Sequence, residues 1–171
     1  MMEIVKKNSL CWHPILNAGL VIGVLIVLSD LLFVQWWGIS NAFLVLFFQV
    51  FGIIFAQRFY REVYLNKTIS YAMALKVGTL TMGAVGFIRA VYYVVLFKLK
   101  PSVWDSILLN VESVYFKLGV PDADVALMLD PIRGGISPVL IIISFIISSL
   151  ITGFFISLIT SIYTKRDSVN V

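Results

Sequence analysis

The chain has few of the residues on which most catalytic and metal sites depend. Its 171 residues include one cysteine, Cys11, and one histidine, His13, and only 13% of the residues are charged. A single cysteine excludes an internal disulfide and a paired-cysteine redox motif, and Cys11 with His13 supplies two ligands where a zinc site needs three or four. No glycine-rich phosphate loop, nucleophile elbow or two-histidine helix motif is present in the sequence. We therefore predict a protein that is not an enzyme and that binds no cofactor and no metal.

What the sequence has in excess is long apolar runs. Hydrophobic residues make up 60% of the chain, which leaves too little polar surface to cover a water-soluble globule. Four runs, at about 14–34, 41–57, 71–97 and 138–163, approach or exceed the 20 or so residues that a helix needs to cross a bilayer. None shows the strict alternation of a membrane β-strand. We predict an all-α polytopic membrane protein, a four-transmembrane-helix bundle that forms a single membrane domain over residues 1–171.

Lysine and arginine are distributed unevenly between the segments that flank these runs. Residues 1–13, 58–70 and 164–171 hold seven of them in 34 residues, whereas 35–40 and 98–137 hold four in 46. The positive-inside rule then predicts that both termini are cytoplasmic and that the loop 98–137 is extracytoplasmic. The net charge of +4 indicates contact with the lipid bilayer and needs no nucleic acid as a partner, because basic residues at the inner face suit insertion and anionic lipid.

The loop 98–137 carries the pattern of two helices. Apolar residues recur at helical spacing from Ser102 to Leu118, and a short second helix is predicted from Asp122, as its cap, to about Leu129. Pro131 with Gly134 and Gly135 predicts a turn after it. Because the first helix is amphipathic, it would bind a partner, lie on the outer leaflet or form a lid over its own bundle. We favour the lid, since such loops usually bury their apolar stripe locally.

Two of the predicted spans contain a charge, Asp30 in the first and Arg89 in the third. A charge within a span is costly and almost always has a partner. Gly19 and Gly23 share a helix face with Asp30, and Gly78 shares one with Arg89. Since small residues let helices approach closely, we predict an intramembrane ion pair between Asp30 and Arg89. Such a pair would be a gate, a proton or ion site, or a structural clasp; we favour the clasp, because a relay needs further titratable groups.

The fourth span repeats small residues at every fourth position. This spacing is typical of close helix–helix contacts in membranes, so the first interpretation is packing inside the bundle. Dimerisation through this face is the second interpretation, and a hydrophilic pore lining is the third. The residues concerned are Ser149, Gly153, Ser157 and Ser161.

One stretch of the sequence resembles a known family. Arg58, Tyr60 and Arg61, followed by Ile69–Gly78 (ISYAMALKVG), together with four spans and a long outer loop, are similar to the bacterial membrane family called domain of unknown function 4199. The likeness covers Pro14 to Lys165. It implies a protein of the bacterial inner membrane, and it supplies no activity and no catalytic residues.

The functional prediction is correspondingly coarse. We expect an integral inner-membrane protein that is a structural or accessory component in the assembly of the cell envelope, with a second copy or another envelope membrane protein as its partner. The alternative is a small solute or ion transporter or a channel subunit that works as an oligomer. Neither an inverted repeat nor a span broken at its middle is visible in the sequence, and this counts against transport. A membrane enzyme is the third interpretation.

Overall fold

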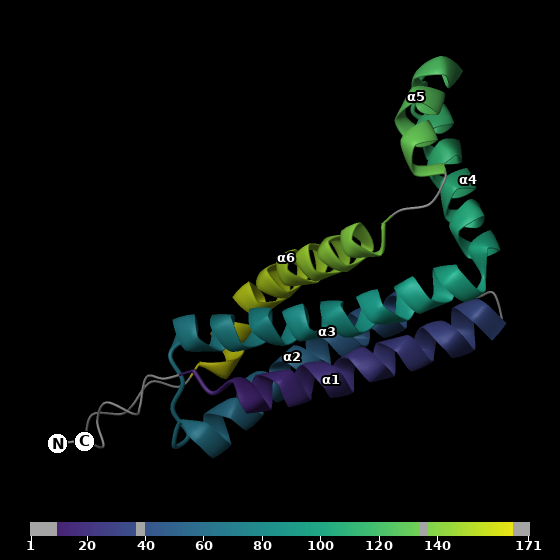
Figure 1. Cartoon of the computed structure of the whole chain (residues 1–171). Helices are drawn as coiled ribbons and strands as arrows, with labels where there is room; N and C mark the ends of the chain where they lie inside the picture. Colours follow the sequence, from purple (N-terminus) through teal and green to yellow (C-terminus); the bar gives the residue numbers. More distant parts are fainter. Residues whose placement is uncertain (1–9, 37–39, 134–136, 166–171) are drawn as a thin grey trace. The chain divides into compact units, whose positions relative to one another are not determined.

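A computed structural model describes residues 10–36, 40–133 and 137–165 (Figure 1). Four of its helical segments are long and apolar enough to cross a membrane: Trp12–Val34, Ala42–Tyr64, Tyr71–Leu99 and Pro138–Thr164. The prediction of an all-α polytopic membrane protein with four spans is therefore confirmed. The described elements are α1 (Trp12–Ser29), η2 (Asp30–Trp36), α2 (Ala42–Tyr64), α3 (Tyr71–Leu99), α4 (Pro101–Lys117), α5 (Asp122–Arg133) and α6 (Pro138–Thr164).

The described residues divide into two compact units. The first contains the residues up to Arg89 and those from Phe145 onward, and the second contains Ala90–Ser144. In the first unit, α1 and α2 lie side by side as a bundle with α3 up to Arg89 and α6 from Phe145 onward (Figure 1). The second unit contains α4 and α5. The structure describes each unit by itself, so a single domain over residues 1–171 stays a prediction.

The bundle has an apolar interior and an apolar exterior. One group of buried side chains includes Ile15, Tyr60 and Val77, and a second includes Ile26 and Met82. The outward faces also carry large apolar side chains, as hydrocarbon surroundings require of a membrane helix. Examples are Phe47, Phe51, Phe55, Ile151, Phe155 and Ile159, each at least half exposed.

α2 extends past the end that hydropathy predicts. The apolar run ends at Gln57, but the helix continues to Tyr64. The extra two turns contain polar side chains with hydrogen-bond partners outside α2: the Tyr60 hydroxyl accepts one from the backbone N–H of Cys11, just before α1, and Arg61 donates one to α6. Hydropathy marks the end of an apolar surface, whereas the helix ends where its backbone and side chains lose their partners.

The first span changes helical type at Asp30. α1 ends at Ser29, and Asp30–Trp36 continues as the π-helix η2. The backbone N–H of Asp30 faces the carbonyls of both Ile26 and Val27, a shared hydrogen bond that is common at the end of an α-helix. Nothing in the sequence pattern predicts this change, because the hydrophobic run continues through it.

The turn between α2 and α3 closes with two residues in the left-handed region. Asn66 has φ 48° and Lys67 has φ 67°. The N–H groups of Leu65 and Lys67 both reach the carbonyl of Arg61, at 3.3 and 3.1 Å. Carbonyls at a helix end need such partners, so the turn terminates α2 at the cost of an unfavourable backbone conformation at a lysine.

The second unit is built on the two predicted loop helices, which form an antiparallel pair. Leu108 of α4 packs in its interior with the fully buried Val125 and the nearly buried Leu129 of α5. The indole N–H of Trp104 donates to the carbonyl of Ile132 at 3.2 Å, which joins the start of α4 to the end of α5.

The second loop helix is longer than its sequence pattern indicates. α5 begins at Asp122, so this residue lies inside the helix instead of preceding it as a cap, and the helix continues through Pro131 to Arg133. The predicted turn is therefore wrong at Pro131, whereas Gly134 and Gly135 lie outside the described residues. A proline lacks the backbone N–H and is most disruptive in a helix interior; in the last turn of α5 it removes a single bond.

Candidate functional site: buried polar clusters in the bundle

The first polar cluster is centred on Gln57, a fully buried side chain of α2. Its Nε2 donates to the carbonyl of Ala74 on α3 at 3.1 Å and to Oγ of Ser161 on α6 at 3.2 Å. Its Oε1 accepts a hydrogen bond from Oγ1 of Thr164, also on α6, at 2.9 Å. One amide therefore links three helices, and all of its three hydrogen bonds join α2 to another span.

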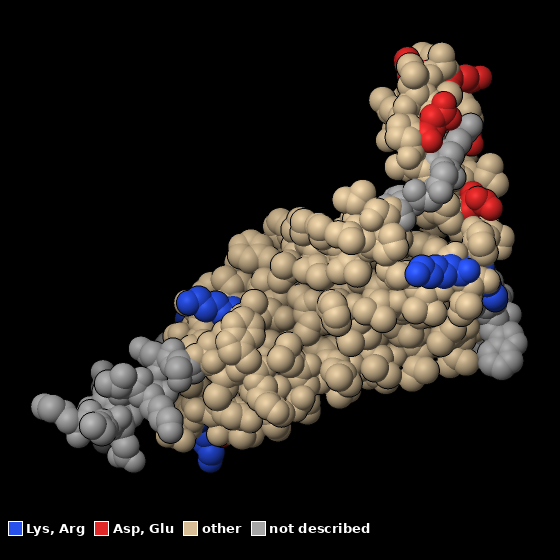
Figure 2. Space-filling model, viewed as in Figure 1, with Lys and Arg blue, Asp and Glu red and all other residues tan. Residues whose placement is uncertain are grey.

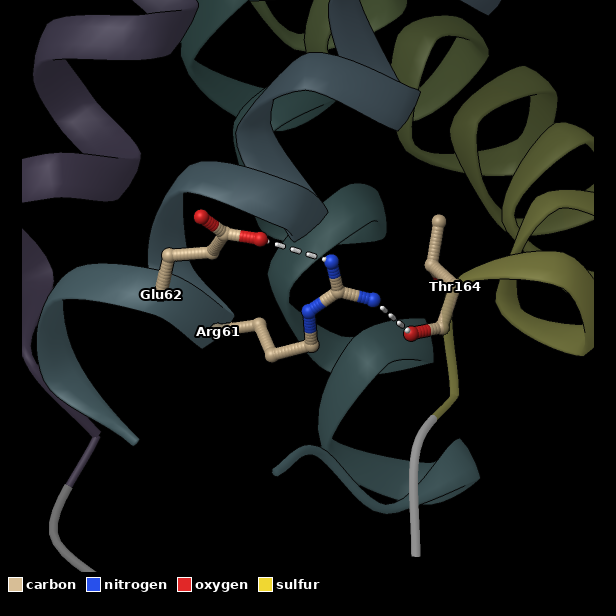
Figure 3. A network of polar contacts seen from close by, with 3 residues as sticks. All are labelled: Arg61, Glu62 and Thr164. Atoms are coloured by element: carbon tan, nitrogen blue, oxygen red, sulfur yellow. Dashed lines mark hydrogen bonds and ion pairs between the residues drawn. The ribbon is translucent and has the colours of Figure 1, made fainter. Parts of the chain in front are cut away.

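Arg61 lies one turn beyond Gln57 and contacts the same helix. Its guanidinium donates from Nη1 to the backbone carbonyl of Thr164 at 3.1 Å and from Nη2 to Oε1 of Glu62 at 2.9 Å (Figure 3). Thr164 is the last residue of α6, where the helix dipole places partial negative charge. The Arg61 side chain is 13% exposed and that of Glu62 57%, so the ion pair with Glu62 is solvent-screened and contributes little.

Of this cluster, the sequence predicts only Ser161, as a small residue of a packing face. Hydropathy places Gln57 at the end of a span and Arg61 in a loop. The signal is nevertheless present in the spacing, because Gln57 and Arg61 are four residues apart and share a helix face. A second helix face, on the fourth span, carries Ser157, Ser161 and Thr164 at intervals of four and three residues.

A second cluster joins the end of α1 to the start of α2. Nδ2 of Asn41 lies 2.5 Å from Oδ1 of Asp30 and 3.1 Å from Oγ of Ser29, and it donates to both. The hydroxyl of Ser29 donates to the carbonyl of Ile26 at 2.7 Å. Asp30 is only 4% exposed, and a hydrogen bond to a carboxylate is stronger than one between neutral groups.

Arg89 lies at a different contact, between α3 and α6. Its Cζ is 5.5 Å from the centre of the Phe145 ring, an arrangement in which the guanidinium is attracted to the face of the ring. Within the described residues its Nε is buried without a hydrogen-bond partner. The contacts established for the two intramembrane charges are thus with Asn41 and with Phe145, and the Asp30–Arg89 ion pair stays a prediction.

Gly19 and Gly23 place α1 directly against α3. A Cβ atom at Gly19 would lie 2.5 Å from Cβ of Ala84 and 2.8 Å from the carbonyl of Thr81. One at Gly23 would lie 2.9 Å from Cβ of Ile88. Both glycines are buried, and neither position has room for a methyl group unless the helices separate.

The small residues of α6 contact the other face of α3. A Cβ at Gly78 would collide with Oγ of Ser157, and one at Gly153 would collide with the side chain of Met82. Ser149 lies opposite Gly86, and a Cβ at Gly86 would lie 2.7 Å from Cβ of Ser149. With Ser161 bonded to Gln57, the four predicted small residues of α6 all face the interior of the bundle and all are buried.

The chemistry that these residues support is helix association. Among the described residues, no three of the side chains of His, Cys, Asp or Glu come together as metal ligands would. The amide, hydroxyl and guanidinium groups of the clusters are bonded mainly to groups of other spans, and such interhelical bonds hold membrane helices together.

Comparison with known proteins gives one match. The model of a family described as a protein of unknown function (DUF4199) matches residues 17–166. No curated protein and no solved structure matches the chain.

Proposed function

The chain belongs to the DUF4199 family of proteins of unknown function, and from this premise we propose that it is a non-enzymatic accessory protein of the bacterial inner membrane. In this proposal both termini are cytoplasmic, the four spans anchor the chain, and the pair α4–α5 is presented outside the membrane to another protein of the cell envelope. The observation that carries the proposal is the composition of the surface of this helix pair.

The face of α4 that is turned away from α5 combines apolar and acidic residues. Trp104 and Leu108 lie on the side that packs in the second unit. Leu109 and Phe116 are 64% and 45% exposed and, seven residues apart, share one face. Asp105 is exposed next to them. Large apolar side chains at the surface of a water-exposed element mark an interaction site more often than isolated apolar residues do.

α5 repeats this combination. Leu127 is 73% exposed and Met128 57%, and the exposed Asp124 lies three residues before Leu127. Figure 2 shows acidic side chains gathered on this part of the molecule, whereas the visible face of the spans is almost free of them. Five of the nine acidic residues of the chain belong to these two helices: Asp105, Glu112, Asp122, Asp124 and Asp130.

The mixed character of this surface favours a protein over a lipid as its partner. A helix that lies on a membrane usually has basic residues on its polar face, which attract anionic lipid. Here the acidic excess would be repelled by the same lipid, while a partner with basic residues around an apolar centre would match both features. The surface thus favours partner binding over the outer-leaflet interpretation.

The polar clusters of the bundle support the anchoring role. Gln57, Arg61 and Asn41 connect helices to one another, and glycines close the contacts of α3 with α1 and α6. A bundle held in this way suits a membrane anchor whose functional surface lies elsewhere in the chain.

Photo-crosslinking in native membranes tests the proposal. A photoreactive residue replaces Leu109 or Leu127 on the helix pair, and Phe55 on the outside of the bundle is the matched exposed control. We expect both helix-pair positions to crosslink to the same envelope protein and Phe55 to crosslink to lipid. Crosslinks from Leu109 and Leu127 solely to the spans of the same chain would show the lid and overturn the proposal.

A separate reporter checks the topology. A reporter enzyme that is active only outside the cytoplasm, fused after Val171, is expected to be inactive. Activity of this fusion would place the C-terminus outside and the helix pair inside, and the partner would then have to be cytoplasmic.

One observation favours transport as the second candidate. Asp30 is buried where the first span changes from an α-helix to a π-helix, and such changes within helices are frequent at functional sites. Solute-dependent flux through liposomes that contain the purified chain, lost in Asp30→Asn, would favour this candidate over the accessory role.

A further inference from the structure

A groove between α1 and α2 has the form of a lipid-binding site. Its cavity has a volume of about 270 Å³. It is lined by residues of both helices: Pro14, Asn17, Ala18, Val21 and Ile22 from α1, and Phe55, Phe59 and Tyr64 from α2. Both helices belong to the first unit, and both are spans. The groove is therefore on the part of the surface that hydrocarbon surrounds.

The α2 wall of the groove consists of two aromatic rings held in register. The rings of Phe55 and Phe59 are stacked, with centroids 6.1 Å apart and planes inclined by 16°. They are 68% and 43% exposed. Two stacked rings form a flat apolar wall at a fixed orientation, against which an extended hydrocarbon chain packs with little loss of side-chain freedom.

The groove is apolar at one end and polar at the other. Val21, Ile22 and Phe55 line the end that lies toward the middle of the spans. Asn17 lines the other end, and its Nδ2 lies 3.2 Å from Nδ1 of His13, one turn earlier on α1. From Pro14 to Ile22 the helix rises by about 12 Å, so the polarity changes along the direction in which a lipid molecule changes from headgroup to acyl chain.

The polar end offers the donors that a phosphate requires. An imidazole that accepts a hydrogen bond at Nδ1 carries its proton on Nε2. The amide of Asn17 has a second N–H that its contact with His13 does not use. In the tautomer whose Nδ1 accepts from Asn17, two N–H donors therefore remain, that of Asn17 in the lining of the groove and that of His13 one turn earlier on α1. Arg58 is exposed on α2 next to Phe59 and adds positive charge at this end of the bundle.

We propose that the groove between α1 and α2 binds one phospholipid molecule. One acyl chain occupies the cavity against Phe55 and Phe59, and the phosphate accepts hydrogen bonds from Asn17 and His13. The inference is independent of the proposed accessory role, because it requires only that α1 and α2 cross a bilayer. A phospholipid that is held at both ends remains bound when bulk lipid is removed. This retention distinguishes it from the surrounding lipid molecules.

Native mass spectrometry of the detergent-purified chain tests the proposal. We expect the chain to retain one phospholipid after extensive detergent exchange. Ala18→Trp places an indole in the groove that Ala18 lines, and Leu16→Trp places one on the exposed side of α1, where Leu16 is 53% exposed. The indole at Ala18→Trp fills the space proposed for the acyl chain, so this variant is expected to lose the lipid, whereas Leu16→Trp is expected to keep it.

The headgroup contact has its own variants. Asn17→Leu and His13→Phe preserve the size of the side chains and remove their donors, and each is expected to lower the retained phospholipid several-fold. If both variants retain the lipid as the wild type does, the phosphate contact is wrong. A wild-type chain that retains no phospholipid, or an equal loss in Ala18→Trp and Leu16→Trp, overturns the site.

A measurement on the unmodified chain covers the case in which Ala18→Trp does not fold. A spin-labelled phospholipid added to the reconstituted wild-type chain is expected to show an immobilised fraction that unlabelled phospholipid displaces and that a single-chain fatty alcohol does not displace. Displacement by the alcohol at the same concentration would show a hydrocarbon contact without headgroup recognition and would contradict the proposal.

Discussion

The guanidinium of Arg61 on α2 donates a hydrogen bond to the backbone carbonyl of Thr164, the last residue of α6. The contact joins the second span to the end of the fourth, more than a hundred residues later in the chain. It satisfies a carbonyl that has no partner within its own helix and places a positive charge at the negative end of the helix dipole.

Replacing Arg61 by alanine should loosen the end of α6. The variant loses a hydrogen bond from a charged donor and the dipole interaction, and we expect the free energy of unfolding to fall by about 1–2 kcal/mol. Chemical unfolding in mixed micelles measures this. Arg58→Ala is the matched control, since Arg58 is exposed and its loss should change stability by less than about 0.5 kcal/mol. Equal effects of the two substitutions would contradict the role of the Thr164 contact.

Gln57 and Thr164 should be energetically coupled. Oγ1 of Thr164 donates to Gln57 and also to the carbonyl of Thr160, so Thr164→Val removes an interhelical and an intrahelical bond at once. A double-mutant cycle with Gln57→Leu isolates the interhelical part. Polar contacts between membrane helices average roughly 0.6 kcal/mol and reach about 1.7 kcal/mol, and we expect a coupling energy in this range. A cycle with Thr152→Val in place of Thr164→Val should give no coupling.

The end of α2 shows how far the sequence determines the helices of this protein. The four spans are predicted because an apolar run of sufficient length has few alternatives to crossing a bilayer. The last two turns of α2 are missed because a polar side chain such as Arg61 extends a helix only when another helix supplies its partner. That partner, the carbonyl of Thr164, comes from a distant part of the chain.

The sequence identifies some residues of the candidate sites but not the partners that they contact. The small residues are identified from spacing alone, and in the structure Gly78, Gly153 and their counterparts lie at helix contacts. Asp30 and Arg89 stand out in the sequence because they are charges in apolar runs. Their contacts with Asn41 and Phe145 do not stand out, because an asparagine between two spans and a phenylalanine within one are ordinary residues in a membrane protein.

Gly78 and Gly83 on α3 should respond differently to the same methyl group. A Cβ at Gly78 meets Oγ of Ser157 and lies 2.9 Å from both Nε2 of Gln57 and Cγ2 of Ile53. We expect Gly78→Ala to destabilise the bundle by about 1–3 kcal/mol, as overpacking does. At Gly83 the nearest atom is the end of the flexible Leu150 side chain, at 2.9 Å.

The expected result for Gly83→Ala is a change near zero, because helix propensity improves while Leu150 adjusts. Unfolding of both variants in mixed micelles provides the comparison. Ser157→Gly combined with Gly78→Ala should recover part of the loss. Recovery would be absent if the effect of Gly78→Ala arose from a contact other than the one with α6.

The turn after α2 offers a stabilising substitution. Lys67 has φ 67°, a conformation that costs a side-chain-bearing residue about 1–2 kcal/mol and glycine almost nothing. We expect Lys67→Gly to raise the thermal midpoint of unfolding. Lys67→Ala removes the same charge and keeps the backbone strain, so it should leave the midpoint unchanged. A similar rise in both variants would assign the effect to the charge.

The predicted ion pair between Asp30 and Arg89 can be separated from the hydrogen bond between Asp30 and Asn41. Asp30→Asn keeps an oxygen that accepts from Asn41, so the hydrogen bond alone predicts normal accumulation of the protein. If the carboxylate also neutralises Arg89, its loss leaves a buried charge without compensation, which costs about 3–5 kcal/mol. We expect Asp30→Asn and Arg89→Gln each to reduce accumulation in membranes, measured by quantitative immunoblotting. The exchanged pair, Asp30→Arg with Arg89→Asp, should restore it. Normal accumulation of both single variants, or failure of the exchange, would leave Asn41 and Phe145 as the partners that matter for these two charges.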